Sequence, residues 1–144
     1  MSANRIVVGV AAATLLLAGL APAVAASPRS GELHVTKECS QYFGGAGEFC
    51  TFTSSNIKAI DAGDRIFYAE AASAISLDTD VVLAGGPGGV AFGHCTLVWA
   101  SLPGQCTFWG GTGIFTHFNA SVAVSPDSAG LWHWDGTYSF SPKA

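Results

Sequence analysis

Charged side chains are scarce in this sequence. Asp, Glu, Lys and Arg together make up 11% of its 144 residues, whereas apolar residues make up 49%. So little charge beside so much apolar content excludes an intrinsically disordered chain, which has the opposite balance. The charges are mainly negative, with ten acidic residues against six basic ones. Because the phosphates of nucleic acids attract clustered Lys and Arg, no nucleic-acid partner is expected.

Motifs of catalysis and metal binding are also missing. Neither G-x-S-x-G nor H-E-x-x-H occurs, so neither a nucleophile elbow nor a zinc-protease helix is predicted. The cysteines lack the close C-x2-C spacing of most zinc sites. A Ser-His-Asp triad stays open because serines are plentiful, yet no pattern selects one of them. We therefore predict no metal and no cofactor.

The N-terminus has the pattern of a cleaved signal peptide. Arg5 lies in a short polar start, an apolar run covers residues 6–20, and Ala-Val-Ala occupies residues 23–25. A charged start, a short apolar segment and an A-x-A site are typical of secretory signals. The alternative is a membrane anchor, which needs about 20 apolar residues, and Pro22 ends this run too early. We expect cleavage after Ala25 or Ala26, so that residues 1–26 form the signal peptide.

Residues 27–144 are then a single secreted domain. A chain of this size can bury a core of its own. No second apolar stretch of membrane-spanning length follows, so no membrane span is expected in the mature chain. Loss of Arg5 leaves five basic residues against ten acidic ones, which makes the mature domain more acidic than the full chain.

All four cysteines, Cys39, Cys50, Cys95 and Cys106, lie in the mature part. An exported chain meets an oxidising environment, so an even number of cysteines predicts disulfides. Three pairings are open. The spacing favours Cys39–Cys50 and Cys95–Cys106, because each pair brackets a glycine-containing turn that can join two antiparallel strands. Each bridge closes a short loop and contributes about 3 kcal/mol of stability.

Glycine and proline recur throughout the mature part, and the segments between them are rich in Val, Phe, Thr, Trp and Tyr. This spacing is typical of successive strands in a barrel or a sandwich, and no long helix is expected. Only residues 56–62 are ambiguous. The expected strands cover about residues 32–38, 48–55, 64–72, 77–84, 90–102, 105–110, 112–125 and 131–141.

The last of these segments alternates most clearly. Trp132, Trp134, Tyr138 and Phe140 share one face, and polar residues take the other. Such alternation indicates one buried face and one wetter face. Short sequential strands with tight turns favour an antiparallel meander, and closing it removes the exposed edges. We predict an all-β fold, an eight-stranded antiparallel up-and-down β-barrel, with a two-sheet sandwich as the alternative.

A glycine-rich hexapeptide adds a resemblance to a known family. Gly110-Gly111-Thr112-Gly113-Ile114-Phe115 resembles the G-G-T-G-x-F signature of the dirigent and allene oxide cyclase barrel superfamily. Residues 93–97 fall where that superfamily has a Gly-led strand, and residues 99–108 have a matching hairpin length. The rest of the chain matches only by its number of strands.

This resemblance implies a bacterial secreted member with the barrel fold, a cavity for an apolar small molecule, and a homo-oligomer, a trimer. It carries over no catalytic residue. Plant dirigent proteins usually have an Arg after the signature, where this chain has Asn119 and no Arg. None of its carboxylates aligns with the Glu of the allene oxide cyclases. The signature also has a physical meaning, because Gly110, Gly111 and Gly113 permit positive φ and a bulge, and Phe115 can then plug one end of the barrel.

Few polar side chains are candidates to line such a cavity: Glu70, Asp78, Asp80, His94, His117, His133 and Asp135. Glu70 is in phase with Ile66 and Tyr68, so it is a candidate buried carboxylate for acid–base chemistry. A solvated position at the end of a strand is the commoner case. His94 shares the face of Phe92 and is the second candidate, although a hydrogen-bonded strand histidine is commoner. Asp78 and Asp80 share one face, where a solvated pair is favoured over a cation or glycosidase site.

Three functional hypotheses follow. The leading one is a secreted, disulfide-stabilised β-barrel that binds or orients a small apolar molecule in its cavity. The second is an isomerase or cyclase acting on such a ligand, with Glu70 or His94 as the acid–base group. The third is a structural or interaction protein of the cell surface, with a filled barrel and an exposed aromatic patch of Trp132 and Trp134.

Overall fold

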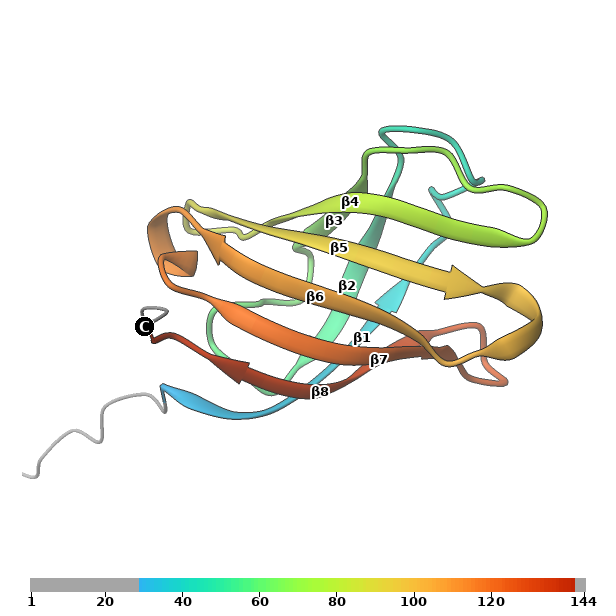
Figure 1. The fold of residues 1–144 in the computed structure, drawn as a ribbon. Coiled ribbons are helices and arrows are strands. Elements are labelled where there is room, and N and C mark those ends of the chain that lie inside the picture. Colours follow the sequence, from blue (N-terminus) through green and yellow to red (C-terminus); the bar gives the residue numbers. More distant parts are fainter. Residues whose placement is uncertain (1–28, 142–144) are drawn as a thin grey trace, which may run out of the picture.

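The computed structural model describes residues 29–141, and the predicted signal peptide, residues 1–26, lies outside them. Eight strands and two short 3-10 helices make up this part of the chain (Figure 1). In chain order they are β1 (Ser30–Glu38), β2 (Phe49–Ser55), β3 (Arg65–Tyr68), β4 (Ser76–Ala84), β5 (Val90–Val98), η1 (Trp99–Ser101), β6 (Gly104–Gly111), η2 (Gly113–Phe115), β7 (Asn119–Pro126) and β8 (Trp132–Ser139).

The strands form one closed antiparallel barrel. Each strand pairs with the next along the chain, and β1 also pairs with β8. That closing ladder runs from Ser30 opposite Ser139 to Lys37 opposite Trp132. Closure gives every strand two neighbours and leaves no exposed edge. The predicted eight-stranded up-and-down barrel is confirmed, and the sandwich alternative is wrong.

Three strand boundaries differ from the sequence prediction. β3 ends at Tyr68 rather than near residue 72, and β5 ends at Val98, where η1 begins. The predicted strand 112–125 begins only at Asn119, because η2 occupies residues 113–115. Gly113 has a φ of 58°, which turns the chain out of the extended conformation at that point. Apolar composition alone did not distinguish this turn from a strand.

Alternation along the strands decides what lies inside the barrel. On β4, Leu77, Thr79 and Val81 are buried, and the intervening Asp78 and Asp80 are exposed. β8 also alternates as predicted, with Trp134 fully buried. The exposed patch of Trp132 and Trp134 expected for a surface interaction protein is therefore absent, because Trp134 lies in the core.

Aromatic side chains fill the middle of the barrel and the end at η2. The Trp134 ring centroid lies 5.1 Å from that of Phe52 and 5.4 Å from that of Phe108. Phe118 continues this cluster, with its ring 5.9 Å from Phe108 and 5.4 Å from Phe115. Phe115 has no exposed surface, so it closes this end as predicted.

The glycine signature makes room for that plug. A Cβ atom on Gly111 would lie 2.7 Å from the Cβ of Phe115 and 2.2 Å from the carbonyl oxygen of Val90. Gly110 and Gly113 have positive φ, as predicted, whereas Gly111 needs glycine for close approach rather than for φ. A bulge accompanies the signature, because Phe92 pairs with Gly110 while the next residue of β5 pairs with Phe108.

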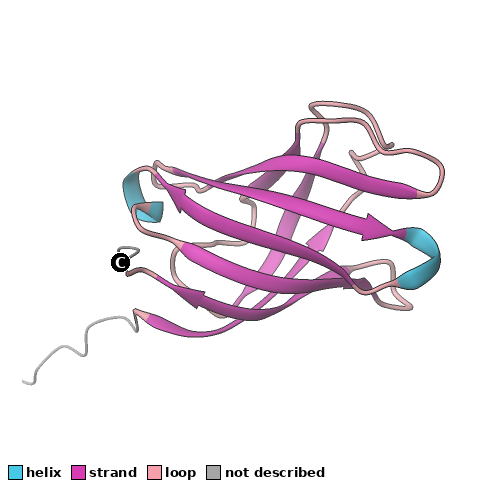
Figure 2. Ribbon diagram, viewed as in Figure 1, coloured by secondary structure: helices cyan, strands magenta, loops and turns pink. Residues whose placement is uncertain are grey.

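The two 3-10 helices lie at opposite ends of the barrel (Figure 2). Phe115 plugs the η2 end. At the η1 end, the odd-numbered strands β1, β3, β5 and β7 finish, and the even-numbered strands β2, β4, β6 and β8 begin. Within residues 29–141, no helix is long and apolar enough to cross a membrane.

Candidate functional site

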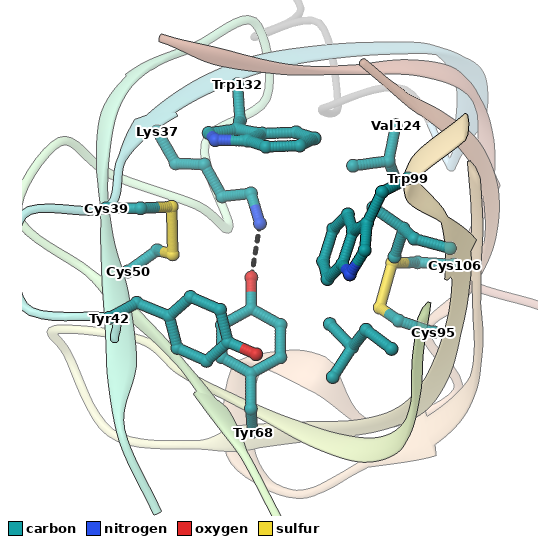
Figure 3. Close-up of a pocket in the computed structure, with 12 residues that line it drawn as sticks. Lys37, Cys39, Tyr42, Cys50, Tyr68, Cys95, Trp99, Cys106, Val124 and Trp132 are labelled. Carbon is teal, nitrogen blue, oxygen red and sulfur yellow. Dashed lines mark hydrogen bonds between the residues drawn. A yellow bond between two sulfur atoms is a disulfide. The ribbon is translucent and has the colours of Figure 1, made fainter. Parts of the chain in front are cut away.

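The barrel is not filled at its η1 end. A pocket with a cavity volume of about 40 Å³ lies there and opens at the mouth of the barrel (Figure 3). Its walls come from all eight strands, from η1 and from the loop after β1. They consist of Lys37, Cys39, Tyr42, Cys50, Tyr68, Leu77, Cys95, Leu97, Trp99, Cys106, Val124 and Trp132. We call this the mouth pocket.

Two disulfides form opposite walls of the mouth pocket (Figure 3). Cys39–Cys50 links the chain just after β1 to β2, and Cys95–Cys106 links directly opposed residues of β5 and β6. The pairing favoured by the spacing is confirmed. Because both bridges lie at the same end, they fix four strands around the pocket and give it stiff, apolar walls.

Lys37 is the only basic residue in these walls. It follows Leu33 and Val35 in phase on the inward face of β1, and only 4% of its surface is exposed. Its Nζ atom donates a hydrogen bond to the Tyr68 hydroxyl. The ammonium position also lies 5.1 Å from the ring centroid of Tyr68 and 5.4 Å from that of Trp134. Within residues 29–141 no carboxylate pairs with it.

Burial without a counter-ion changes the acid–base chemistry of this pocket. Removal from water disfavours the ammonium form and lowers the pKa of Lys37 to about 7. The same cause acts in the opposite direction on a phenol, so burial raises the pKa of Tyr68 far above its usual range. Near neutral pH, the mouth pocket therefore holds an amine that is neutral in about half of the molecules, next to a neutral phenol.

Tyr42 supplies a second hydroxyl to the pocket. Its ring centroid lies 4.7 Å from that of Tyr68, and burial raises its pKa. The Tyr42 hydroxyl oxygen is buried, and no group within residues 29–141 forms a hydrogen bond with it. A buried hydroxyl without a partner is unfavourable. The pocket thus offers a molecule that enters it one free hydroxyl, one amine and otherwise apolar surface.

Glu70 does not face the mouth pocket. It is exposed just after β3, where its carboxylate accepts hydrogen bonds from the Thr79 hydroxyl at 2.6 Å and the Asp80 backbone N–H at 2.7 Å. These contacts fix the chain reversal that ends β3. Glu70 therefore stabilises a turn at the solvated end of the strand, which is the commoner case of the two weighed for it, and it is not a buried carboxylate beside Ile66 and Tyr68.

His94 lies on the outer surface of the barrel, on the face of Phe92. Its ring nitrogens lie 2.8 Å from an Asp80 oxygen and 2.5 Å from an Asp78 oxygen. The hydrogen bond to Asp80, with a smaller contribution from Asp78, raises the pKa of His94. Neighbouring side chains of β5 point to opposite faces, and Cys95 points into the pocket. The side chain of His94 therefore points away from the pocket and cannot reach it. The second acid–base candidate is therefore outside the cavity as well.

The remaining polar candidates also lie outside the mouth pocket. Asp135 holds His34 at 2.8 Å, and His133 contacts Asp127 at 2.7 Å. His117 is exposed with a φ of 63°. In the described part of the chain, no group of three or more His, Cys, Asp or Glu residues is arranged to hold a metal ion.

The sequence contained a signal for Lys37 that the candidate set omitted. A basic residue in phase with Leu33 and Val35 on a predicted strand is unusual, because charged side chains are rarely buried without a partner. Its significance depends on Tyr68, which is 31 residues away in sequence. Only the barrel brings the two side chains together.

No protein-family model, no curated protein and no solved structure matches this chain. The geometry of the mouth pocket is therefore the basis for assigning a function.

Proposed function

We propose that this protein is a secreted barrel of the dirigent and allene oxide cyclase type that binds a small, largely apolar molecule at its mouth. The glycine signature, the closed barrel and the two disulfides support the family and the secretion. The observation that carries the binding function is the mouth pocket, where a buried amine lacks an ionic partner among the described residues. The trimer implied by the resemblance stays a prediction.

The size of the pocket limits what enters it. One water molecule needs about 10–15 Å³ of such space, so a volume of about 40 Å³ holds roughly three waters. Pockets for whole drug-sized ligands are usually about 300–1,000 Å³. The aromatic core blocks deeper entry, because Trp134 and Phe52 fill the barrel below. The pocket therefore accepts one end of a molecule, and the remainder lies over the rim of the barrel.

The chemistry of the walls selects that end. Disulfides, leucines and indole rings favour an apolar or flat group. The Lys37 amine and the Tyr42 hydroxyl favour one oxygen atom that can donate or accept a hydrogen bond. No carboxylate from the described part of the chain, residues 29–141, lines the pocket, so a cationic ligand finds no counter-charge among these residues. The best match is a short aliphatic or aromatic group that carries a single neutral or acidic oxygen.

Phenol is a suitable probe for this proposal because it combines a flat ring with one hydroxyl. Titration followed by NMR should shift the indole N–H signals of Trp99 and Trp132, which line the pocket. Toluene has the same ring shape without the hydroxyl and should bind more weakly. If neither probe shifts these two signals, the binding function is refuted.

A pair of tryptophan variants provides the control. Trp132→Ala removes a wall of the mouth pocket and should weaken phenol binding about fivefold, since one aromatic contact contributes about 1 kcal/mol. Trp109→Ala changes a side chain that is 48% exposed on the outside of the barrel and should leave binding unchanged. Equal losses in both variants would show that phenol binds elsewhere.

A further inference from the structure

Lys37 has two properties that rarely occur together on one side chain. It is almost entirely buried, and it is also part of the wall of a pocket that opens to solvent. Figure 3 shows its Nζ atom pointing into the pocket, between the indole of Trp132 and the hydroxyl of Tyr68. A structural lysine normally extends its amine to water or to a carboxylate. This one directs its amine towards the place that a ligand would occupy.

The surroundings keep that amine available as a nucleophile. Desolvation lowers the pKa of Lys37 to about 7, so that about half of the molecules carry a free lone pair at neutral pH. The titratable side chains that face it are Tyr42 and Tyr68, and both phenols have raised pKa values that keep them neutral. Among residues 29–141, no carboxylate pairs with the amine to restore the ammonium form. Lysines desolvated in apolar pockets are the ones that form Schiff bases.

We propose that Lys37 is a reactive amine that condenses with the carbonyl group of small aldehydes entering the mouth pocket. This inference rests on the proposed function, because the aldehyde has to bind in the same pocket. It defines the ligand class more narrowly, as a molecule whose buried end is an aldehyde.

The reaction balances without any further reagent. The Nζ lone pair attacks the carbonyl carbon, a C–N bond forms, and one amine hydrogen moves to the oxygen to give a carbinolamine. The C–O bond then breaks, and the second amine hydrogen leaves with the hydroxyl as water. An imine remains on Lys37. The neutral Tyr68 hydroxyl, which is already hydrogen-bonded to Nζ, can donate a proton to the departing oxygen and take one from nitrogen.

The test uses propanal with cyanoborohydride, which reduces an imine to a stable propyl-amine. Peptide mapping by mass spectrometry locates the label, and Lys58, which is exposed, serves as the internal reference. At pH 7, the neutral fraction of an amine with a pKa of about 7 is roughly 1,000-fold that of an ordinary lysine. Labelling of Lys37 should therefore exceed that of Lys58 by about tenfold or more, even if access to the pocket slows the reaction.

Two variants separate chemistry from folding. Lys37→Met keeps an unbranched apolar side chain in the same place and should lose the label at this position while retaining the fold. Tyr68→Phe keeps Lys37 and removes the hydroxyl, so the label should form more slowly without disappearing. Far-UV circular dichroism and intact disulfides confirm that each variant is folded.

The outcomes distinguish this inference from the binding function. Labelling of Lys37 no faster than that of Lys58 overturns the aldehyde chemistry. If phenol still shifts the signals of Trp99 and Trp132 in that case, the binding function stands and Lys37 only shapes the pocket. If benzoate binds and raises the midpoint of Lys37 titration without any labelling, the site binds acids and the inference is overturned. If no probe binds or reacts, both proposals fail.

Discussion

Replacing Lys37 with Met should stabilise the protein at neutral pH and destabilise it in alkali. The folded state binds fewer protons than the unfolded state between about pH 7 and the ordinary lysine value of 10.5. Stability of the wild type therefore rises with pH across this window. Each pKa unit corresponds to about 1.4 kcal/mol, so burial of the amine costs about 4 kcal/mol at pH 7 and about 1 kcal/mol at pH 10.

The Lys37→Met variant removes this cost but leaves the Tyr68 hydroxyl without its partner, which costs about 2 kcal/mol. The variant should therefore be more stable than the wild type by about 2 kcal/mol at pH 7 and less stable by about 1 kcal/mol at pH 10. The sign of the difference should change between these two values.

Urea unfolding with the disulfides intact, at pH 7, 8, 9 and 10, measures this difference. Other groups also titrate nearby. The raised pKa values of Tyr42 and Tyr68 contribute to the free energy of unfolding, and this contribution is lost above pH 10. The raised pKa values of His34 and His94 make a similar contribution, which is lost as pH rises through the folded-state pKa of each histidine. Subtracting wild type from variant cancels the histidine contributions. A difference that stays constant from pH 7 to pH 10 would refute the argument that Lys37 is buried as a neutral amine.

Three further outcomes are expected. Replacing Cys95 and Cys106 together with Ala should lower the free energy of unfolding by about 3 kcal/mol, measured by urea denaturation, and equal stability would contradict it. Phe115→Ala should cost about 3–5 kcal/mol because its ring is fully buried in the plugged end, whereas a loss below 1 kcal/mol would show that the plug is dispensable. Asp80→Asn should lower the NMR-measured pKa of His94, since the hydrogen bond to Asp80 is the largest cause of its raised value, and an unchanged pKa would assign that role to Asp78.

The fold was largely predictable because its determinants are local. Period-two alternation around Trp134 identified a buried face, and recurrent glycines separated the strands. The Cys95–Cys106 pairing was predictable for the same reason, because a hairpin places its two ends opposite each other. These signals fall within a dozen residues of each other and need no knowledge of the tertiary structure.

The mouth pocket was not predictable because it depends on contacts between distant segments. Lys37 and Tyr68 lie on strands that are not neighbours, and only closure of the barrel brings their polar ends together. Glu70 is a candidate because it is in phase with Ile66 and Tyr68 along the sequence, and His94 because it shares the face of Phe92. The direction of each side chain depended on where β3 ended and on which face of β5 was buried, and composition did not specify either one.

Direct titration of the Lys37 side chain tests the central claim, that the mouth pocket holds a neutral amine. Carbon NMR of the lysine Cε signals, with Lys37→Met to assign the resonance, follows this group through its protonation. We predict a midpoint at about pH 7. A Lys37 that stays protonated until about pH 10, as an ordinary lysine does, would contradict the account.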